Sequence, residues 1–164
     1  MIQAIKQMHN TDITCLLVGG KATPAYNQEL KDLIQTLPEQ TTLKMVSVGA
    51  DKMPLVYALS DVVVSASLFP ESFGRTIAEA NAMNKIVVAF NHGGPTETIV
   101  DGKTGFLVPV ADVSALATAL DKVLNLTPEA KKTMERAARK NTEDHFSVQK
   151  MCEKTLNLYK EILS

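Results

Sequence analysis

The sequence has no long apolar run, few cysteines and almost no net charge. Its longest apolar stretches, such as Cys15–Val18 and Val62–Val64, are far shorter than the ~20 residues that a membrane-spanning helix needs. The N-terminus also lacks the apolar core of a signal peptide. The net charge of −1 leaves no clustered basic excess of the kind that binds nucleic acid. We therefore expect a soluble, cytoplasmic chain with no transmembrane segment and no nucleic-acid partner.

The two cysteines, Cys15 and Cys152, do not have the spacing of metal ligands, and Cys15 lies in an apolar run. Both features indicate inert thiols in a reducing compartment. Motifs of several well-known chemistries are also missing: there is no G-x-x-x-x-G-K-S/T loop, no G-x-G-x-x-G, no G-x-S-x-G and no H-E-x-x-H. An Asp-x-Asp pair that could hold a divalent metal against a diphosphate is absent too. We predict no metal site and no cofactor.

What is present fits one globular domain. The chain has 164 residues, of which 45% are hydrophobic and 21% charged, so it can bury a core of its own. Short apolar runs alternate with segments of helical period, and the first run is expected to be buried on both faces. The expected strands are Ile13–Val18, Leu43–Val48, Val62–Ala66, Ile86–Phe90 and Phe106–Val108. Strands separated by helices predict a Rossmann-like α/β fold with a parallel sheet.

The expected helices are delimited by proline, capping residues and apolar periodicity. In chain order they are a helix from Pro24 to before Pro38, Met53–Leu59, Gly74–Met83, a turn at Thr96–Val100, and helices starting at Asp112, at Thr127 and at Phe146. The last, Phe146–Leu163, carries an apolar face with the residues Val148, Met151, Cys152, Leu156, Tyr159 and Leu163.

Ligands of parallel α/β sheets bind beyond the carboxyl ends of the strands. Four loops are expected at that edge: Gly19–Thr23, Gly49–Lys52, Ser67–Arg75 and Asn91–Pro95. The third is the most informative, because Gly74 lets the backbone approach a ligand just where a helix begins. The free N–H groups at residues 73–76, including that of Phe73, and the positive helix end predict an anion site.

Polar side chains around this helix start extend the prediction. Arg75 and the hydroxyls of Ser72 and Thr76 would strengthen binding of a phosphate. Glu71 lies in the loop before the helix, and Glu79 lies one turn into it, four residues after Arg75. Two carboxylates beside a phosphate site make sense if the ligand also carries hydroxyl groups, and a nucleotide sugar has that combination.

Simpler interpretations stand beside this one. Thr76 to Glu79 also fits a capping box, in which Glu79 only ties down a helix start. Glu71 could be a solvated loop charge, and Arg75 could be no more than an i,i+4 partner of Glu79. His92, which precedes two glycines, is interpreted as a surface-turn residue.

The run from Pro70 to Ala80 resembles the E-x7-E signature of the retaining GT-B glycosyltransferases of the group 1, family 4 type. Further runs resemble that family's second domain and occur in the right order: Leu17–Gly20, Tyr57–Asp61, Gly93–Val108 and Asp112–Leu120. The resemblance covers nearly the whole chain. It identifies the fold as the C-terminal, donor-binding half of a GT-B enzyme.

The resemblance implies roles for individual residues. Glu71 would lie beside the donor sugar as the catalytic residue, and the amides of Phe73, Gly74 and Arg75 would hold the sugar and the diphosphate. Glu79 would bind the ribose hydroxyls, and Gly49 would mark the nucleobase pocket. Transfer would use no metal and retain the anomeric configuration. Polysaccharide or lipopolysaccharide biosynthesis would be the setting.

One departure from the family pattern is large. In the family, the second domain begins with a strand and a loop that carries an Arg and a Lys for the diphosphate, and here both are missing, as is the first domain. We therefore expect a single truncated domain whose partner is a separately encoded N-terminal domain, through which it could associate peripherally with a membrane. The family strand order, 3-2-1-4-5-6, places the missing strand between Ile13–Val18 and Val62–Ala66. We expect this gap to be closed by direct pairing or filled by a partner's strand.

Three functions remain open at this point. The chain could be one half of a glycosyltransferase, acting with its missing domain on a nucleotide-diphosphate sugar. It could be a non-catalytic nucleotide-sugar-binding remnant or split subunit, which would keep the same residues. A sugar-nucleotide epimerase or a phosphorylase of the same two-domain architecture is the third reading, and the Glu71–Glu79 motif disfavours it.

Overall fold

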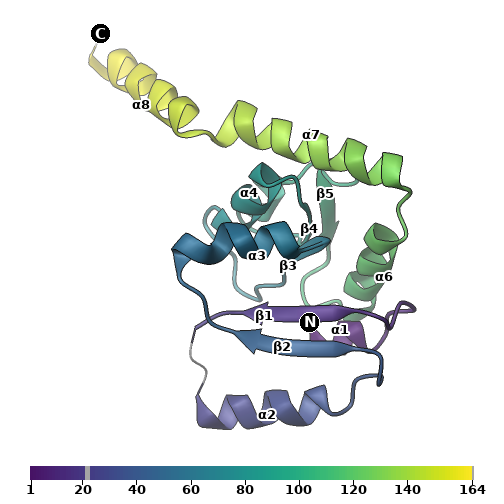
Figure 1. The fold of residues 1–164 in the computed structure, drawn as a ribbon. Coiled ribbons are helices and arrows are strands. Elements are labelled where there is room, and N and C mark those ends of the chain that lie inside the picture. Colours follow the sequence, from purple (N-terminus) through teal and green to yellow (C-terminus); the bar gives the residue numbers. More distant parts are fainter. Residues whose placement is uncertain (21–22, 164) are drawn as a thin grey trace.

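A computed structural model describes residues 1–20 and 23–163 (Figure 1). Every expected strand forms, with ends that shift by one or two residues. The strands are β1 (Thr14–Val18), β2 (Thr42–Val46), β3 (Val62–Ser65), β4 (Ile86–Phe90) and β5 (Gly105–Val108). All pairings between them are parallel, which confirms the predicted Rossmann-like α/β class.

The helices also follow the sequence signals. They are α1 (Ile2–Ile5), α2 (Pro24–Ile34), the short 3₁₀ helix η1 (Ala50–Lys52), α3 (Met53–Leu59), α4 (Arg75–Ala82), α5 (Pro95–Thr98), α6 (Val113–Leu124), α7 (Pro128–Phe146) and α8 (Val148–Leu163). Side chains of Thr23, Asp112 and Thr127 accept the capping hydrogen bonds at the starts of α2, α6 and α7. None of the described helices is both long and apolar enough to cross a bilayer.

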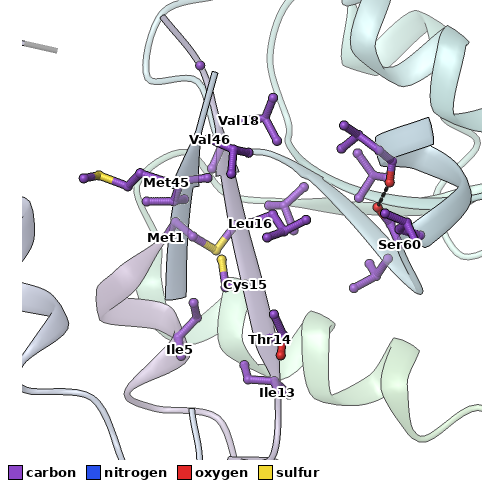
Figure 2. Close-up of a pocket in the computed structure, with 18 of the residues that line it drawn as sticks. Met1, Ile5, Ile13, Thr14, Cys15, Leu16, Val18, Met45, Val46 and Ser60 are labelled. Atoms are coloured by element: carbon purple, nitrogen blue, oxygen red, sulfur yellow. Dashed lines mark hydrogen bonds between the residues drawn. The ribbon is translucent and has the colours of Figure 1, made fainter. Parts of the chain in front are cut away.

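The strands form two sheets rather than one. β1 pairs only with β2, and β3, β4 and β5 form a second sheet in that order. Direct pairing of β1 with β3, one of the two expected ways to close the gap, does not occur. A groove with a volume of about 1390 Å³ lies between these two strands instead, lined along its length by both (Figure 2). We call it the β1–β3 groove. The resulting order, β2-β1-groove-β3-β4-β5, keeps the predicted arrangement with the central strand left out.

The core is built around β4, whose two faces contact two different apolar clusters. Ile86, Val88 and Phe90 pack with residues of α1 and α6, and Val87 and Ala89 pack with α3 and α4. This alternation follows from the period of two along a strand. All five residues of β4 are at most 5% exposed, because β4 has a paired strand on each edge and helices on each face.

β1 is less buried than β4. It was expected to be buried on both faces, and the structure corrects that: Leu16 and Val18 are 37% and 36% exposed. Both side chains line the β1–β3 groove. The reason is the missing neighbour, since an apolar strand is buried only where other elements cover it.

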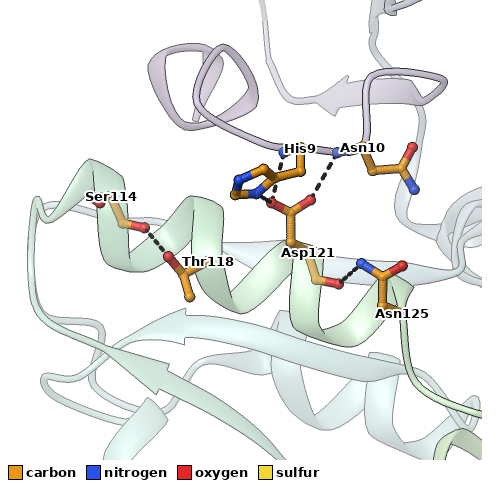
Figure 3. A network of polar contacts seen from close by, with 6 residues as sticks. All are labelled: His9, Asn10, Ser114, Thr118, Asp121 and Asn125. Carbon is orange, nitrogen blue, oxygen red and sulfur yellow. Dashed lines mark hydrogen bonds and ion pairs between the residues drawn. The ribbon is translucent and has the colours of Figure 1, made fainter.

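The β1–β2 half is attached through α1 and the segment after it. Ala4, Ile5 and Met8 pack into the core beside α6. Asp121 of α6 accepts the backbone N–H groups of His9 (2.8 Å) and Asn10 (3.1 Å) and contacts His9 Nδ1 at 3.0 Å (Figure 3). Desolvation alone would raise the pKa of Asp121, but these hydrogen bonds outweigh it and lower the pKa.

α8 leaves the body of the protein beyond α7 (Figure 1). Its predicted apolar residues are present on the helix but not covered: Val148 is 74% exposed and Leu163 is 85% exposed. Among the described residues, its main contacts are with α7.

Candidate functional site

The predicted anion site is formed by the turn from the loop after β3 into α4. Gly74 is the N-cap of α4 and has φ of +76°, a left-handed conformation that favours glycine. Ile77 and Ala78 donate their N–H groups to the Gly74 carbonyl, at 2.9 and 3.4 Å. Within the described chain, the amides of Arg75 and Thr76 before them have no acceptor. They are available to an anion at the positive end of the helix dipole.

Two of the four predicted loops meet at this turn. Gly94 donates its N–H to the Glu71 carbonyl at 2.7 Å, and His92 Nε2 lies 2.9 Å from the Ser67 carbonyl oxygen. Gly93 has φ of +59°, and a Cβ there would lie 2.6 Å from the Glu71 carbonyl oxygen. A Cβ at Gly94 would collide with the Phe73 backbone. The two glycines therefore allow Asn91–Pro95 to pack against Ser67–Arg75, and His92 helps to join the two loops.

Glu79 is held from two sides. Its Oε1 accepts from Arg75 Nη2 at 3.1 Å, and its Oε2 accepts from the Tyr57 hydroxyl of α3 at 3.0 Å. The capping-box interpretation of Glu79 is wrong, because α4 begins at Gly74 without a side-chain cap and the Glu79 carboxylate bonds elsewhere. The predicted i,i+4 pair with Arg75 does form, and it is exposed, with 82% of the Arg75 side chain accessible.

Tyr57 is a site residue to which sequence reasoning assigned no role. Its side chain is 3% exposed. Burial, followed by the hydrogen bond to Glu79 and the negative charge of Glu79, raises the pKa of Tyr57 to about 12. The phenol therefore stays protonated and donates. The only sequence signal for a role in the site was that Tyr57 belongs to the Tyr57–Asp61 run, which resembles the family's second domain. Without that resemblance, a buried aromatic residue on a short helix indicates only core packing.

Glu71 has an unpaired carboxylate. In residues 1–20 and 23–163 its side chain makes no hydrogen bond or ion pair, while its backbone carbonyl is fixed by Gly94. A Cβ built on Gly74 would lie 3.7 Å from Glu71 Oε2. The carboxylate therefore lies beside the anion-binding turn with its charge available to a ligand.

The remaining predicted residues are placed less directly. Phe73 is 40% exposed, and its ring packs edge-to-face on Phe146 at the end of α7, with centroids 5.7 Å apart. Thr76 lies in the first turn of α4, while Ser72 is exposed in the loop before it. Gly49 precedes η1, which leads into the helix that carries Tyr57. Residues 21–22 of the predicted loop Gly19–Thr23 lie outside the described residues.

Comparison with known proteins gives a consistent match. The family model "Glycosyl transferases group 1" matches residues 1–141. A D-inositol 3-phosphate glycosyltransferase from Saccharomonospora viridis is 32% identical over 155 residues, which are 93% of this chain and 35% of that protein.

Solved structures agree in fold. A glycosyltransferase from Rickettsia africae superposes with a TM-score of 0.88 at 37% identity, over 99% of this chain and 43% of that one. The Anabaena protein HepE, solved in complex with UDP-glucose, gives a TM-score of 0.85 at 28% identity, over 98% of this chain and 44% of that one. The chain thus spans less than half the length of these relatives.

Proposed function

The chain belongs to the group 1 glycosyl transferases, and we propose on that premise that it is the donor-binding domain of a retaining enzyme. Its ligand would be a nucleotide-diphosphate sugar, and the acceptor would be a growing polysaccharide or lipopolysaccharide. The proposal uses no metal and no cofactor. It rests chiefly on one observation: a glycine-capped helix start with unsatisfied amides lies directly beside two carboxylates, one free and one held by Tyr57 and Arg75.

Each part of this arrangement fits a part of such a donor. The amides of Phe73, Gly74 and Arg75, with the Ser72 and Thr76 hydroxyls, suit the diphosphate oxygens. Glu79 suits the ribose diol, because a carboxylate accepts two hydrogen bonds from adjacent hydroxyls. The exposed Arg75 side chain can turn from Glu79 toward the diphosphate when the ribose takes its place. Gly49 would border the nucleobase pocket.

Glu71 is the proposed catalytic residue. Its unpaired carboxylate beside the turn is placed to stabilise positive charge that develops on the sugar as the diphosphate leaves. The helix end and Arg75 would stabilise the departing diphosphate. Retention of configuration follows in the proposal from the family resemblance.

We propose that the 164-residue chain alone does not transfer sugar. Positioning of two reactants contributes up to ~7–11 kcal/mol to catalysis, and an acceptor site would come from an N-terminal domain, the part of the relatives that this chain does not match. That domain would also supply the cationic pair for the diphosphate and any peripheral association with a membrane. A cytoplasmic location is proposed from the two free thiols, Cys15 and Cys152. A purified chain that glycosylates an acceptor efficiently would contradict this part.

A test of the donor site is calorimetric titration with UDP-, GDP- and ADP-sugars. We expect binding of one class, and Glu79→Ala should weaken it by ~1–3 kcal/mol, because the ribose hydroxyls lose their acceptor. Glu143→Ala is the matched control, since Glu143 forms the same i,i+4 pair with Arg139 on α7. Equal affinity of the two variants, or no binding across the panel, would overturn the assignment.

A further inference from the structure

Two side chains near the end of α7 contact the loops of the candidate site from outside it. α7 packs across α4 and β4 (Figure 1). Asn141 contacts α5, which follows the loop Asn91–Pro95, and Phe146 contacts Phe73 in the loop before α4. Neither Asn141 nor Phe146 belongs to a motif that the sequence assigned to the site.

A chain of hydrogen bonds connects Asn141 to the backbone of Glu71. Asn141 Nδ2 donates to the Thr98 carbonyl at 3.0 Å, which lies at the end of α5, where helix carbonyls have no donor within the helix. The Thr98 hydroxyl donates to the Gly94 carbonyl at 3.1 Å, and Gly94 N–H donates to the Glu71 carbonyl at 2.7 Å. Thr98 is fully buried, so these bonds are shielded from water. The position of the Glu71 backbone therefore depends on α7.

Glu71 relies on this backbone support because its side chain has no other. Within residues 1–20 and 23–163, the carboxylate makes no hydrogen bond or ion pair. A side chain without contacts of its own is placed by the backbone that carries it. Since a misplacement of about 1 Å can cost an enzyme ~10²-fold in rate, the support at Glu71 bears on catalysis and not only on folding.

An aromatic contact connects Phe146 to the anion-binding turn. The rings of Phe146 and Phe73 meet edge-to-face, with centroids 5.7 Å apart and an interplanar angle of 64°, a favourable geometry for an aromatic pair. The Phe73 backbone lies directly against Gly94, where an added Cβ would lie 2.5 Å from the Phe73 carbonyl oxygen. Phe73 is thus held on two sides, and the next residue is Gly74, the N-cap of α4.

α7 has other contacts that attach it to the body of the protein. Ala138 is fully buried, and Lys131 Nζ lies 3.1 Å from Asp61 Oδ1. Asn141 and Phe146 differ from these residues because the contacts of both lead to the two loops that meet at the site. Attachment of the helix alone does not require that arrangement.

We infer that Asn141 and Phe146 are positioning residues for the donor site. Asn141 places Glu71 through Thr98 and Gly94, and Phe146 places the anion-binding turn through Phe73. Such support by residues outside a site holds its functional groups in a productive geometry. The ligand of the site rests on the proposed function, whereas the coupling between α7 and the two loops is a property of the free protein.

The experiment measures amide hydrogen exchange by NMR on the full chain without ligand. The test variants are Asn141→Ala and Phe146→Leu, and Phe146→Tyr is the conservative variant that keeps the ring. Asn125→Ala is the matched control for the first, because Asn125 Nδ2 also donates to a carbonyl near a helix end, that of Asp121, at 2.8 Å. That bond lies on α6 and leads to neither loop of the site.

We expect Asn141→Ala to accelerate exchange of the Gly94 amide about tenfold. Phe146→Leu should do the same to the amide of Ile77, which closes the first turn of α4. Both amides should keep their original exchange rates in Asn125→Ala and Phe146→Tyr, and the amides of β4 should keep theirs in all four variants. Unchanged exchange of the two amides in the test variants, or equal acceleration in β4, would overturn the inference, because the contacts would then serve global stability alone.

A second readout follows the side-chain amide resonance of Asn141 during titration with UDP, GDP and ADP. A nucleotide that binds should shift this resonance and leave that of Asn125 in place, because coupling between two positions is reciprocal. Its affinity should fall about tenfold in Asn141→Ala and in Phe146→Leu, and Phe146→Tyr should restore it. A residue that only supports the fold would produce neither the shift nor the rescue.

The two readouts separate this inference from the proposed function. If none of the three nucleotides binds, the donor site is contradicted, and the exchange rates in the free protein still decide whether α7 positions the loops. If a nucleotide binds the test variants as tightly as the original chain, the donor site stands and the positioning role is overturned.

Discussion

β1 and β4 are both largely apolar strands, but one is partly exposed and the other is fully buried. β4 reads Ile-Val-Val-Ala-Phe and is buried throughout, while β1 reads Thr-Cys-Leu-Leu-Val and is exposed at every second residue. β4 has paired neighbours on both edges, and β1 has one. Apolar composition therefore marks a strand suited to a central position, but burial itself depends on the elements that surround it.

The two halves also differ in how they are stabilised. One apolar cluster, around Tyr57, Ile77 and Val87, lies within the β3–β4–β5 half, whereas the cluster around Ile86 and Val88 is shared with α1, β1 and β2. The β1–β2 half is joined to the rest of the protein through this shared cluster and through the hydrogen bonds of His9 and Asn10 to Asp121. The free edges of β1 and β3 border an open groove, where water can hydrogen-bond to them. Leaving the backbone groups of these edges unpaired therefore costs less free energy than the ~1–3 kcal/mol that each buried, unpaired group costs.

The largest difference between the halves is expected on truncating one apolar side chain in each. Ile86→Ala in β4 should destabilise the fold by ~2–5 kcal/mol, because Ile86 is fully buried and its removal leaves a cavity. Leu16→Ala in β1 should cost less than about 1 kcal/mol, because Leu16 is partly exposed. Urea unfolding measures both. Equal losses would mean that the groove is closed in solution and that the two strands are alike.

A second prediction concerns the attachment between the halves. Asp121→Asn should destabilise the protein by ~1–3 kcal/mol, because hydrogen bonds to a charged acceptor are lost or weakened. Hydrogen exchange should accelerate in residues 1–18 and 42–46 and change little in β4. Asp112→Asn is the control, since Asp112 is an exposed cap at the start of the same helix and asparagine caps equally well. Uniform acceleration across both sheets would contradict a local attachment.

A third prediction is the pH dependence of that attachment. The pKa of Asp121 is lowered in the folded protein from its ordinary value of 3.8. Its contribution to stability is therefore complete above that value and is lost as the pH falls through the lower, folded pKa. Exchange of the His9 and Asn10 amides, followed by NMR and corrected for the intrinsic rate, should increase in this acid range before β4 responds. The Asp121→Asn variant should lack this step, and an identical step in the variant would assign it to another group.

The sequence predicted the order and kind of the elements well, because strand and helix signals are local. Pro24 and Pro128 begin helices, and the apolar run at Ile86 forms the central strand. The exposure of Leu16 was not predictable, since it depends on a neighbour that the local sequence does not describe. The candidate site was likewise predicted only where its signals are local. Gly74 carries a local signal, whereas the partner that holds Glu79 comes from another helix.

The smallest predicted effect tests that partner, Tyr57, which lies on α3, the helix between β2 and β3 in the chain. Tyr57→Phe removes the hydroxyl that donates to Glu79 Oε2 and should cost ~0.5–1.5 kcal/mol of stability. Affinity for the nucleotide should fall severalfold, because Glu79 is then held by the exposed Arg75 alone. Tyr159→Phe is the control, since Tyr159 is an exposed tyrosine on α8. The informative readout is the double variant Tyr57→Phe with Glu79→Ala in a calorimetric titration. If Tyr57 acts by positioning Glu79, the double variant should bind no more weakly than Glu79→Ala; additive losses would show that Tyr57 contributes to binding independently.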